Sequence, residues 1–203
     1  MKMIRIRQYF VLIIYTFIII RFYEICCTNS FVFLCVLNVK SQTYTAQEMY
    51  IHFFSPAPIA DIEAISNAAI ATINTNKNEI DIELKVGSFK FKKALMQTHF
   101  NEKYIESDKY PNAHYKGKFK DEIDLDKDGL YNLTLDGRFS IHGVEKPKTI
   151  NCTIMVKDKK ITFETAFKLK SADYKIKAPD IIYRKVGQEV SIDAKGILIK
   201  TKN

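Results

Sequence analysis

Apolar and polar residues alternate along most of the chain from Gln42 onward. In Glu79–Val86 every second residue is apolar and the residues between them are charged. This period of two is typical of a β-strand with one face on a core and the other in water. The same alternation predicts further strands over Tyr131–Ile141, Ile150–Val156, Ile161–Leu169 and Glu189–Lys200.

Turn-forming residues separate several of these runs. Asn74–Asn78, Asp126–Gly129 and Lys157–Lys159 contain Asn, Asp or Gly, which favour tight turns. Short strands joined by short turns predict an antiparallel sheet whose apolar face must be covered. Because the pattern predicts little helix, we expect an all-β fold, an antiparallel β-barrel of about eight strands.

One segment departs from the period of two. In Lys92–Tyr104 the apolar residues Leu95, Met96, Phe100 and Tyr104 recur at helical spacing. We therefore expect one short helix near an end of the barrel. There it either completes the core as a plug or covers a cavity as a lid.

The first 41 residues differ from the rest and predict an export signal. Cations in residues 1–8 precede an apolar run over Tyr9–Ile20, and a second apolar run covers Phe31–Leu37. Both runs are shorter than the roughly 20 residues of a membrane-spanning helix. We interpret residues 1–41 as a secretory leader removed after Ser41, and residues 42–203 as one periplasmic or secreted domain. Retention of the leader as an anchor and lipid attachment at Cys35 are the alternatives.

The net charge of +8 is shared unevenly. Residues 1–41 hold five cations and one anion, which leaves 26 cations and 22 anions, a net +4, for residues 42–203. That charge is too small and too scattered to indicate nucleic-acid binding, but it favours an anionic headgroup over a cationic one. The basic stretch Lys168–Lys202 is interpreted as a wet strand face and loop. The alternative is a transient membrane-surface contact by Lys175, Lys177, Arg184 or Lys185.

Cys152 is the single cysteine of residues 42–203, so this part of the chain cannot form an internal disulfide. Its fold must therefore rely on packing. Ile150 and Ile154 flank Cys152 at a spacing of two, which indicates a buried thiol rather than a nucleophile.

Residues suited to metal binding or catalysis show no recognisable spacing. The histidines are His52, His99, His114 and His142, and none belongs to an HExxH motif. Asp124–Gly129 matches the opening of an EF-hand loop, but Leu135 occupies the position that needs a bidentate Glu, so a turn is expected instead. No serine lies in a Gly-x-Ser-x-Gly elbow and no Gly-rich phosphate loop is present. We expect no metal, no cofactor and no enzymatic activity.

A barrel of about eight strands holds either packed side chains or one small ligand. Alternation alone does not separate these cases. Small residues expected on the inner faces leave space beside the large Phe side chains; they are Gly137, Thr165, Ala166, Ala194 and Gly196.

Three segments together resemble a known family. They are Phe89–Tyr104, the turn Ser107–Pro111, and Gly137–Pro147 with its Gly-Arg-Phe-Ser-Ile-His-Gly strand end. In order and spacing they are similar to the YceI-like, polyisoprenoid-binding family of exported bacterial proteins. The resemblance covers about Ile51–Ile199 and implies a lipocalin-like antiparallel barrel with a long apolar pocket and no catalysis. Ile51–Pro58 departs from the family's usual first strand, which puts the identity of the ligand in question more than the fold.

Alternation and resemblance together predict an exported, non-catalytic protein that sequesters or carries a polyisoprenoid-like or other long-chain amphiphilic lipid. The residues expected to form the wall or lid are Phe89, Phe91, Leu95, Met96, Phe100, Phe119, Leu133, Leu135, Phe139, Phe163 and Phe167. His99 or His142 would meet a phosphate headgroup, although His142, before Gly143 at a strand end, suits a structural hydrogen bond. The alternative is a filled-core barrel that acts through its surface as an interaction or stress-response module. No oligomeric state is predicted.

Overall fold

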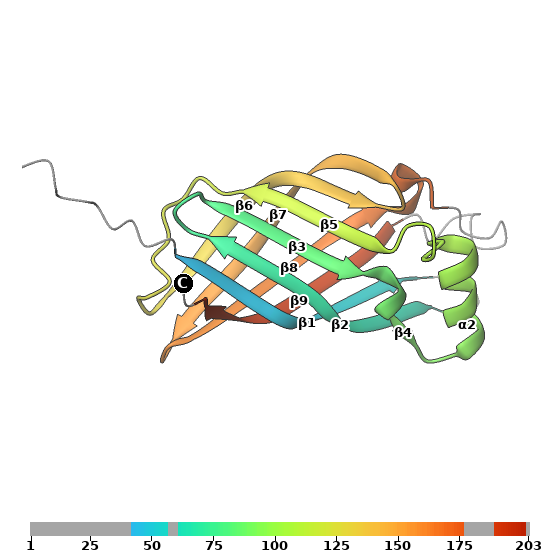
Figure 1. The fold of residues 1–203 in the computed structure, drawn as a ribbon, viewed down its shortest axis with the longest axis horizontal. Helices are drawn as coiled ribbons and strands as arrows, with labels where there is room; N and C mark the ends of the chain where they lie inside the picture. Colours follow the sequence, from blue (N-terminus) through green and yellow to red (C-terminus); the bar gives the residue numbers. More distant parts are fainter. Residues whose placement is uncertain (1–41, 57–60, 177–188, 202–203) are drawn as a thin grey trace, which may run out of the picture. The chain divides into compact units, whose positions relative to one another are not determined.

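A computed structural model describes residues 42–56, 61–176 and 189–201, and these form a β-barrel (Figure 1). Its long strands are β1 (Thr43–Ser55), β2 (Ile62–Asn74), β3 (Glu79–Lys85), β5 (Asn112–Lys118), β6 (Gly129–Ile141), β7 (Val144–Lys157), β8 (Lys160–Lys170) and β9 (Glu189–Lys200). They follow the order β1-β9-β8-β7-β6-β5-β3-β2, and a β1–β2 pairing closes the sheet. Every pairing is antiparallel. The predicted all-β antiparallel barrel of about eight strands is confirmed.

The barrel is complete between Thr43 and Lys200, because its strand pairings and its main core lie within that range. The predicted leader, 1–41, lies outside the described residues, as do Lys177, Arg184 and Lys185. The boundary after Ser41 therefore stays a prediction. Within the part of the chain that the structure describes, no helix is long and apolar enough to cross a membrane.

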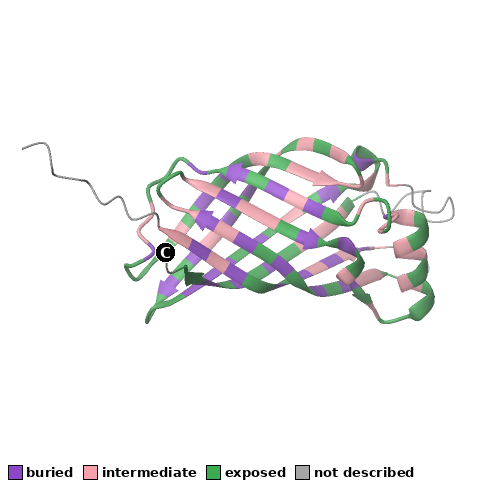
Figure 2. Cartoon of the chain, viewed as in Figure 1, coloured by how far each residue is buried: buried purple, intermediate pink, exposed green. Residues whose placement is uncertain are grey.

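The alternation read from the sequence appears as alternating burial along the strands (Figure 2). β3, β6, β7, β8 and β9 each contain or nearly match a predicted strand. One expectation is wrong: Ala166 is exposed, because Phe163 and Thr165 face the core and the period of two turns residue 166 outward.

The two barrel ends differ. At the helix end lie the paired strand ends Ser55 with Ile62 and Ile141 with Val144. The short elements of this end are η1 (Val86–Ser88), the two-residue strand β4 (Lys90–Phe91), α2 (Ala94–His99), the π-helical η2 (Phe100–Tyr104) and the 3-10 turn η3 (Ser171–Tyr174). α2 and η2 together confirm the predicted short helix. The opposite end, the turn end, carries the tight connections β2–β3 and β7–β8.

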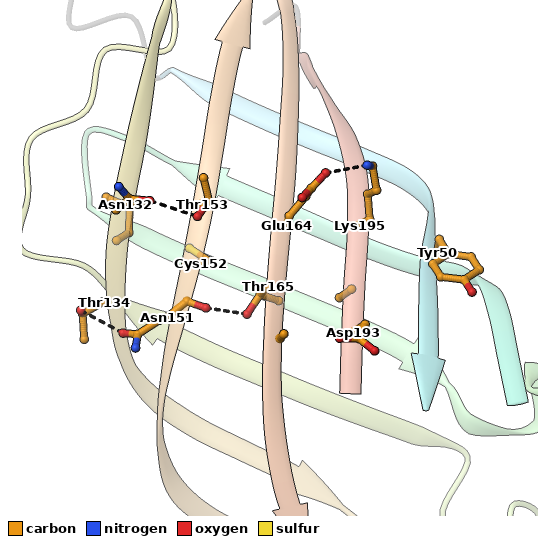
Figure 3. A pocket seen from close by; sticks show the side chains of 13 residues that line it. Tyr50, Asn132, Thr134, Asn151, Cys152, Thr153, Glu164, Thr165, Asp193 and Lys195 are labelled. Atoms are coloured by element: carbon orange, nitrogen blue, oxygen red, sulfur yellow. Dashed lines mark hydrogen bonds and ion pairs between the residues drawn. The ribbon is translucent and has the colours of Figure 1, made fainter. Parts of the chain in front are cut away.

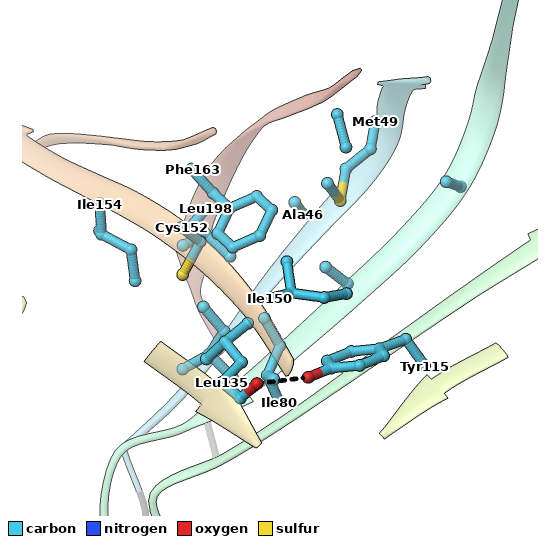
Figure 4. Close-up of a cluster of buried hydrophobic side chains, with 14 of the residues drawn as sticks. Ala46, Met49, Ile80, Tyr115, Leu135, Ile150, Cys152, Ile154, Phe163 and Leu198 are labelled. Carbon is cyan, nitrogen blue, oxygen red and sulfur yellow. Dashed lines mark hydrogen bonds between the residues drawn. The ribbon is translucent and has the colours of Figure 1, made fainter. Parts of the chain in front are cut away.

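Side chains fill the turn-end half of the barrel, here called the packed half. Its fully buried residues include Tyr44, Met49, Leu133 and Ile154, each at most 3% exposed. Gly196 makes room for Met49, because a Cβ at residue 196 would lie 2.5 Å from Met49 Cγ. Figure 4 shows part of the buried core, with Met49, Ile154 and Leu198 among the labelled side chains.

Near the middle of the barrel, the Tyr115 ring packs against Gly117 of β5 and Gly137 of β6. A Cβ at Gly137 would lie 2.8 Å from the Tyr115 ring. The Tyr115 hydroxyl donates to the carbonyl oxygens of Leu135, at 2.9 Å, and Lys148, at 3.2 Å.

The sheet opens in two places at the helix end. β2 pairs with β3 only over Ile70–Asn74, and β4 and η1 occupy the space beyond. β7 pairs with β8 only from Cys152 to Lys157, so Val144–Asn151 and Ala166–Lys170 form no ladder with each other. We call this opening the β7–β8 split.

Candidate functional site

Two adjoining apolar cavities lie in the helix-end half of the barrel. The inner cavity, about 90 Å³, is enclosed by side chains that include Phe89, Tyr115 and Phe163. The mouth cavity, about 130 Å³, is bordered by η2 and η3. Ile141, Leu169 and Ile192 line both. The two cavities are therefore neighbours separated by a few aliphatic side chains.

The mouth cavity is lined by hydrocarbon and a few hydroxyl groups. Its polar lining residues are Ser55, Ser171, Tyr104 and Tyr174, and none of its described lining residues carries a charged side chain. Burial raises the pKa of Tyr104, and burial followed by the charge of Asp173 raises the pKa of Tyr174. Both phenols therefore stay protonated and neutral at physiological pH.

Six of the predicted wall residues line these cavities: Phe89, Leu135, Phe139, Phe163 and Phe167 the inner one, and Phe100 the mouth. Phe119 and Leu133 are buried in the packed core and border neither cavity. Whether any of these side chains contacts a ligand stays a prediction.

The helix is fixed to the barrel by aromatic contacts. Phe100 packs on Phe53, Phe89 and Phe91 with ring centroids 5.6, 5.9 and 4.9 Å apart. Because Phe100 also lines the mouth cavity, this segment is both part of the core and part of the cavity wall. Two predicted residues of α2 lie elsewhere: Met96 is half-buried and borders neither cavity, and Leu95 is 67% exposed. Leu95 is not a wall residue, because it lies on the solvent side of α2.

The two histidines proposed for a headgroup have other neighbours. His142 Nε2 lies 2.8 Å from Glu106 Oε2 and its Nδ1 lies 3.1 Å from the Tyr174 carbonyl oxygen. Both nitrogens are therefore engaged within the protein, as expected for a structural histidine. His99, half-buried at the end of α2, packs edge-on against Tyr104 with centroids 6.5 Å apart.

Sequence reasoning missed several lining residues. Ile141 and Ile192 alternate correctly along β6 and β9 and could have been found by extending that pattern. Phe53 follows an irregularity in β1 that hides its direction, and Ile105 and Tyr174 lie in turns, where the period of two gives no signal.

A further hollow lies outside the barrel, as a groove of about 710 Å³ on the outer faces of β6–β9 and β1 (Figure 3). Several of its polar side chains are paired with one another. Thr134 bonds Asn151 and Thr153 bonds Asn132, both at 3.1 Å, and Lys195 Nζ lies 2.6 Å from Glu164 Oε1. Because the groove lies open to solvent on the outer face of the sheet, it would not bury an apolar tail.

The Cys152 thiol and clusters of metal-ligating side chains are the remaining candidates for reactive chemistry in the described part of the chain. Burial raises the pKa of the Cys152 thiol to about 12, so the thiol stays protonated. No group of three or more His, Cys, Asp or Glu side chains gathers there as a metal site.

Comparison with known proteins agrees with the geometry. Residues 45–197 match the family described as YceI-like domain, which confirms the resemblance seen in the sequence. No curated protein matches the chain.

Solved structures share the fold at low sequence identity. A polyisoprenoid binding domain from Saccharophagus degradans is 14% identical with a TM-score of 0.66, over 80% of this chain and 100% of that one. BcnA from Burkholderia cenocepacia is 17% identical with a TM-score of 0.59, over 74% and 96%. A YceI protein from Campylobacter jejuni is 17% identical with a TM-score of 0.51, over 67% and 81%.

Proposed function

Because the chain belongs to the YceI-like family, we propose that it is an exported, non-catalytic protein whose barrel carries or sequesters a polyisoprenoid-like or other long-chain amphiphilic lipid. The observation that carries this proposal is the pair of adjoining apolar cavities that share Ile141, Leu169 and Ile192 as lining residues. The polyisoprenoid binding domain that shares the fold supports a prenyl tail as the ligand class. The basic, apolar leader supports export to the periplasm or the medium.

The cavity volumes set how much of a tail the barrel takes without rearrangement. An apolar cavity of about 150 Å³ binds one benzene molecule. By that measure, each cavity of about 90 or 130 Å³ alone holds fewer carbons than benzene, and the two together suit a tail segment of about ten carbons once the aliphatic side chains between them move aside. A longer tail requires the half-buried Phe139 and Phe167 to move.

Burial of such a tail supplies the free energy that drives binding. Each buried methylene contributes about 0.8 kcal/mol. Ten of them contribute about 8 kcal/mol before the costs of association. A protein that works in this way needs hydrocarbon walls and no reactive group.

The rival function is a filled-core barrel that acts through its surface as an interaction or stress-response module. The dense packing around Met49 and Ile154, and the small volumes of both cavities, favour it. It predicts that the protein never takes up a lipid.

Native mass spectrometry of purified residues 42–203, followed by organic extraction, separates the two. The lipid-carrier function predicts a discrete added mass that extracts as a prenyl or acyl chain. A mass that stays at the apo value after incubation with polyprenyl lipids would contradict it and support the rival.

A further inference from the structure

The β7–β8 split exposes backbone groups that a continuous ladder would pair. An unpaired strand edge presents a row of free N–H and C=O groups. At this split two carbonyl oxygens accept hydrogen bonds from side chains instead. Thr165 Oγ1 donates to Asn151 O at 2.7 Å, and Lys148 Nζ donates to Lys168 O at 2.7 Å. Side-chain hydrogen bonds therefore satisfy part of the backbone where β7 and β8 separate.

Lys148 spans this split. Its ammonium group lies against β8, 5.9 Å from the centroid of the Phe167 ring. Phe167 in turn packs against Phe139 with centroids 6.0 Å apart, and both rings line the inner cavity. Because Phe139, Phe167 and Lys148 are only half-buried, this wall of the cavity is in contact with solvent.

Three lysines lie at the split, and two of them have carboxylate partners. Lys146 pairs with Asp173 of η3 at 3.2 Å, and Lys168 pairs with Glu189 of β9 at 3.5 Å. Lys148 has a carbonyl partner but, among the described residues, no carboxylate within ion-pair distance. The ammonium group of a half-buried lysine that has no carboxylate partner favours an anion beside it.

We propose that the β7–β8 split binds the anionic headgroup of the lipid, a phosphate or carboxylate held by Lys148, while the tail enters the inner cavity between Phe139 and Phe167. This inference rests on the proposed function and names the class of its ligand. The mouth cavity offers no cation among its described lining residues, so a charged headgroup finds its counter-ion at the split.

Farnesyl phosphate and farnesol form the decisive pair of ligands, because they share a tail and differ in charge. Their affinities for residues 42–203 are measured by calorimetry for the wild-type sequence and for Lys148→Met. Lys160→Met is the matched control, since Lys160 is an exposed turn-end lysine without a described carboxylate partner. Inorganic phosphate is the ligand without a tail.

Wild-type protein should bind farnesyl phosphate about tenfold more tightly than farnesol, as expected for one charge-assisted hydrogen bond. The preference should disappear in Lys148→Met, persist in Lys160→Met and return in Lys148→Arg. A purely structural role for Lys148 would weaken both ligands equally and leave the preference unchanged, which would overturn the proposal.

Three further outcomes would also overturn it. Equal affinity of the wild-type protein for both prenyl compounds would refute the headgroup site and leave the lipid-carrier function intact. Binding of neither would refute the carrier function and the headgroup site together. Inorganic phosphate that binds as tightly as farnesyl phosphate would identify a site for free anions instead of a lipid headgroup.

Discussion

The packed half and the helix-end half of the barrel are built from the same strands but differ in content. Two successive inward-facing residues of β9 show this difference. Gly196 touches Met49, whereas Ala194 borders the inner cavity. The alternation of apolar residues decides which side chains face inward. The sizes of a few of those side chains decide whether the interior is a core or a cavity.

The sheet itself differs between the halves. At the turn end the ladder is continuous from β6 through β9. At the helix end it opens on both sides, and the β2–β3 opening is occupied by β4 while the β7–β8 opening is bridged only by side chains. We infer that the packed half supplies stability and the helix-end half supplies binding.

The largest difference between the two halves is expected when an inward-facing apolar residue of each is replaced, in separate variants, by aspartate. Leu133→Asp puts a carboxylate in the packed core, where residue 133 is 3% exposed. The cost of several kcal/mol per buried ion is comparable with the whole stability of a small domain, about 5–15 kcal/mol. We expect Leu133→Asp to remain unfolded by circular dichroism.

Phe139→Asp is the partner variant, at a half-buried position beside the β7–β8 split. We expect it to fold cooperatively and to lose lipid uptake in native mass spectrometry. The assignment of the inner cavity would be wrong if Phe139→Asp carried lipid as the wild type does.

A smaller contrast comes from adding methyl groups on β9. Gly196→Ala places a Cβ 2.5 Å from Met49 Cγ and should lower the free energy of unfolding by about 1–3 kcal/mol. Ala194→Val projects its extra methyl groups toward the inner cavity, so its stability should change little while its affinity for a prenyl lipid falls. Urea denaturation measures the first effect and calorimetric titration the second. Equal destabilisation by both changes would show that the two halves are packed alike.

The smallest effect concerns pH. Burial raises the pKa of Cys152 from about 9 to about 12 in the folded chain. Between about pH 9 and about pH 12 the thiol therefore ionises only in the unfolded chain. The contribution of the buried thiol to the free energy of unfolding is complete below about pH 9 and is lost as the pH rises through this range. At pH 10 the loss is about 1.4 kcal/mol.

The Cys152→Ala variant isolates this contribution. Its stability should fall less steeply than that of the wild type between about pH 8 and about pH 10 in urea denaturation. Parallel pH profiles for the two proteins would contradict the burial of this thiol.

Five of the eight long strands could be predicted from the sequence; β5 was not predicted, and β1 and β2 left no clear alternation. In β1 the buried residues change from Tyr44 and Ala46 to Met49 and Ile51, because a bulge at Glu48, with φ of 56°, adds a residue. In β2 burial likewise shifts from Ser66 to Ala69. A bulge reverses the period of two, so a pattern search finds no strand there.

The candidate site was predicted less completely, for a physical reason. Leu133 and Phe139 follow the same alternation in β6, yet one is in the packed core and the other lines a cavity. The difference depends on neighbours far apart in sequence, such as Tyr115 lying against Gly137. The β7–β8 split leaves no mark on the sequence, because it depends on where two ladders separate.

The location of a bound prenyl tail tests the central claim most directly. In methyl-labelled residues 42–203, nuclear Overhauser effects from farnesyl phosphate should reach Ile141, Leu169 and Ile192. None should reach Ile154 or Leu198 in the packed half. Contacts to Ile154 and Leu198, or no contact to the helix-end methyl groups, would contradict the division of this barrel into a packed half and a binding half.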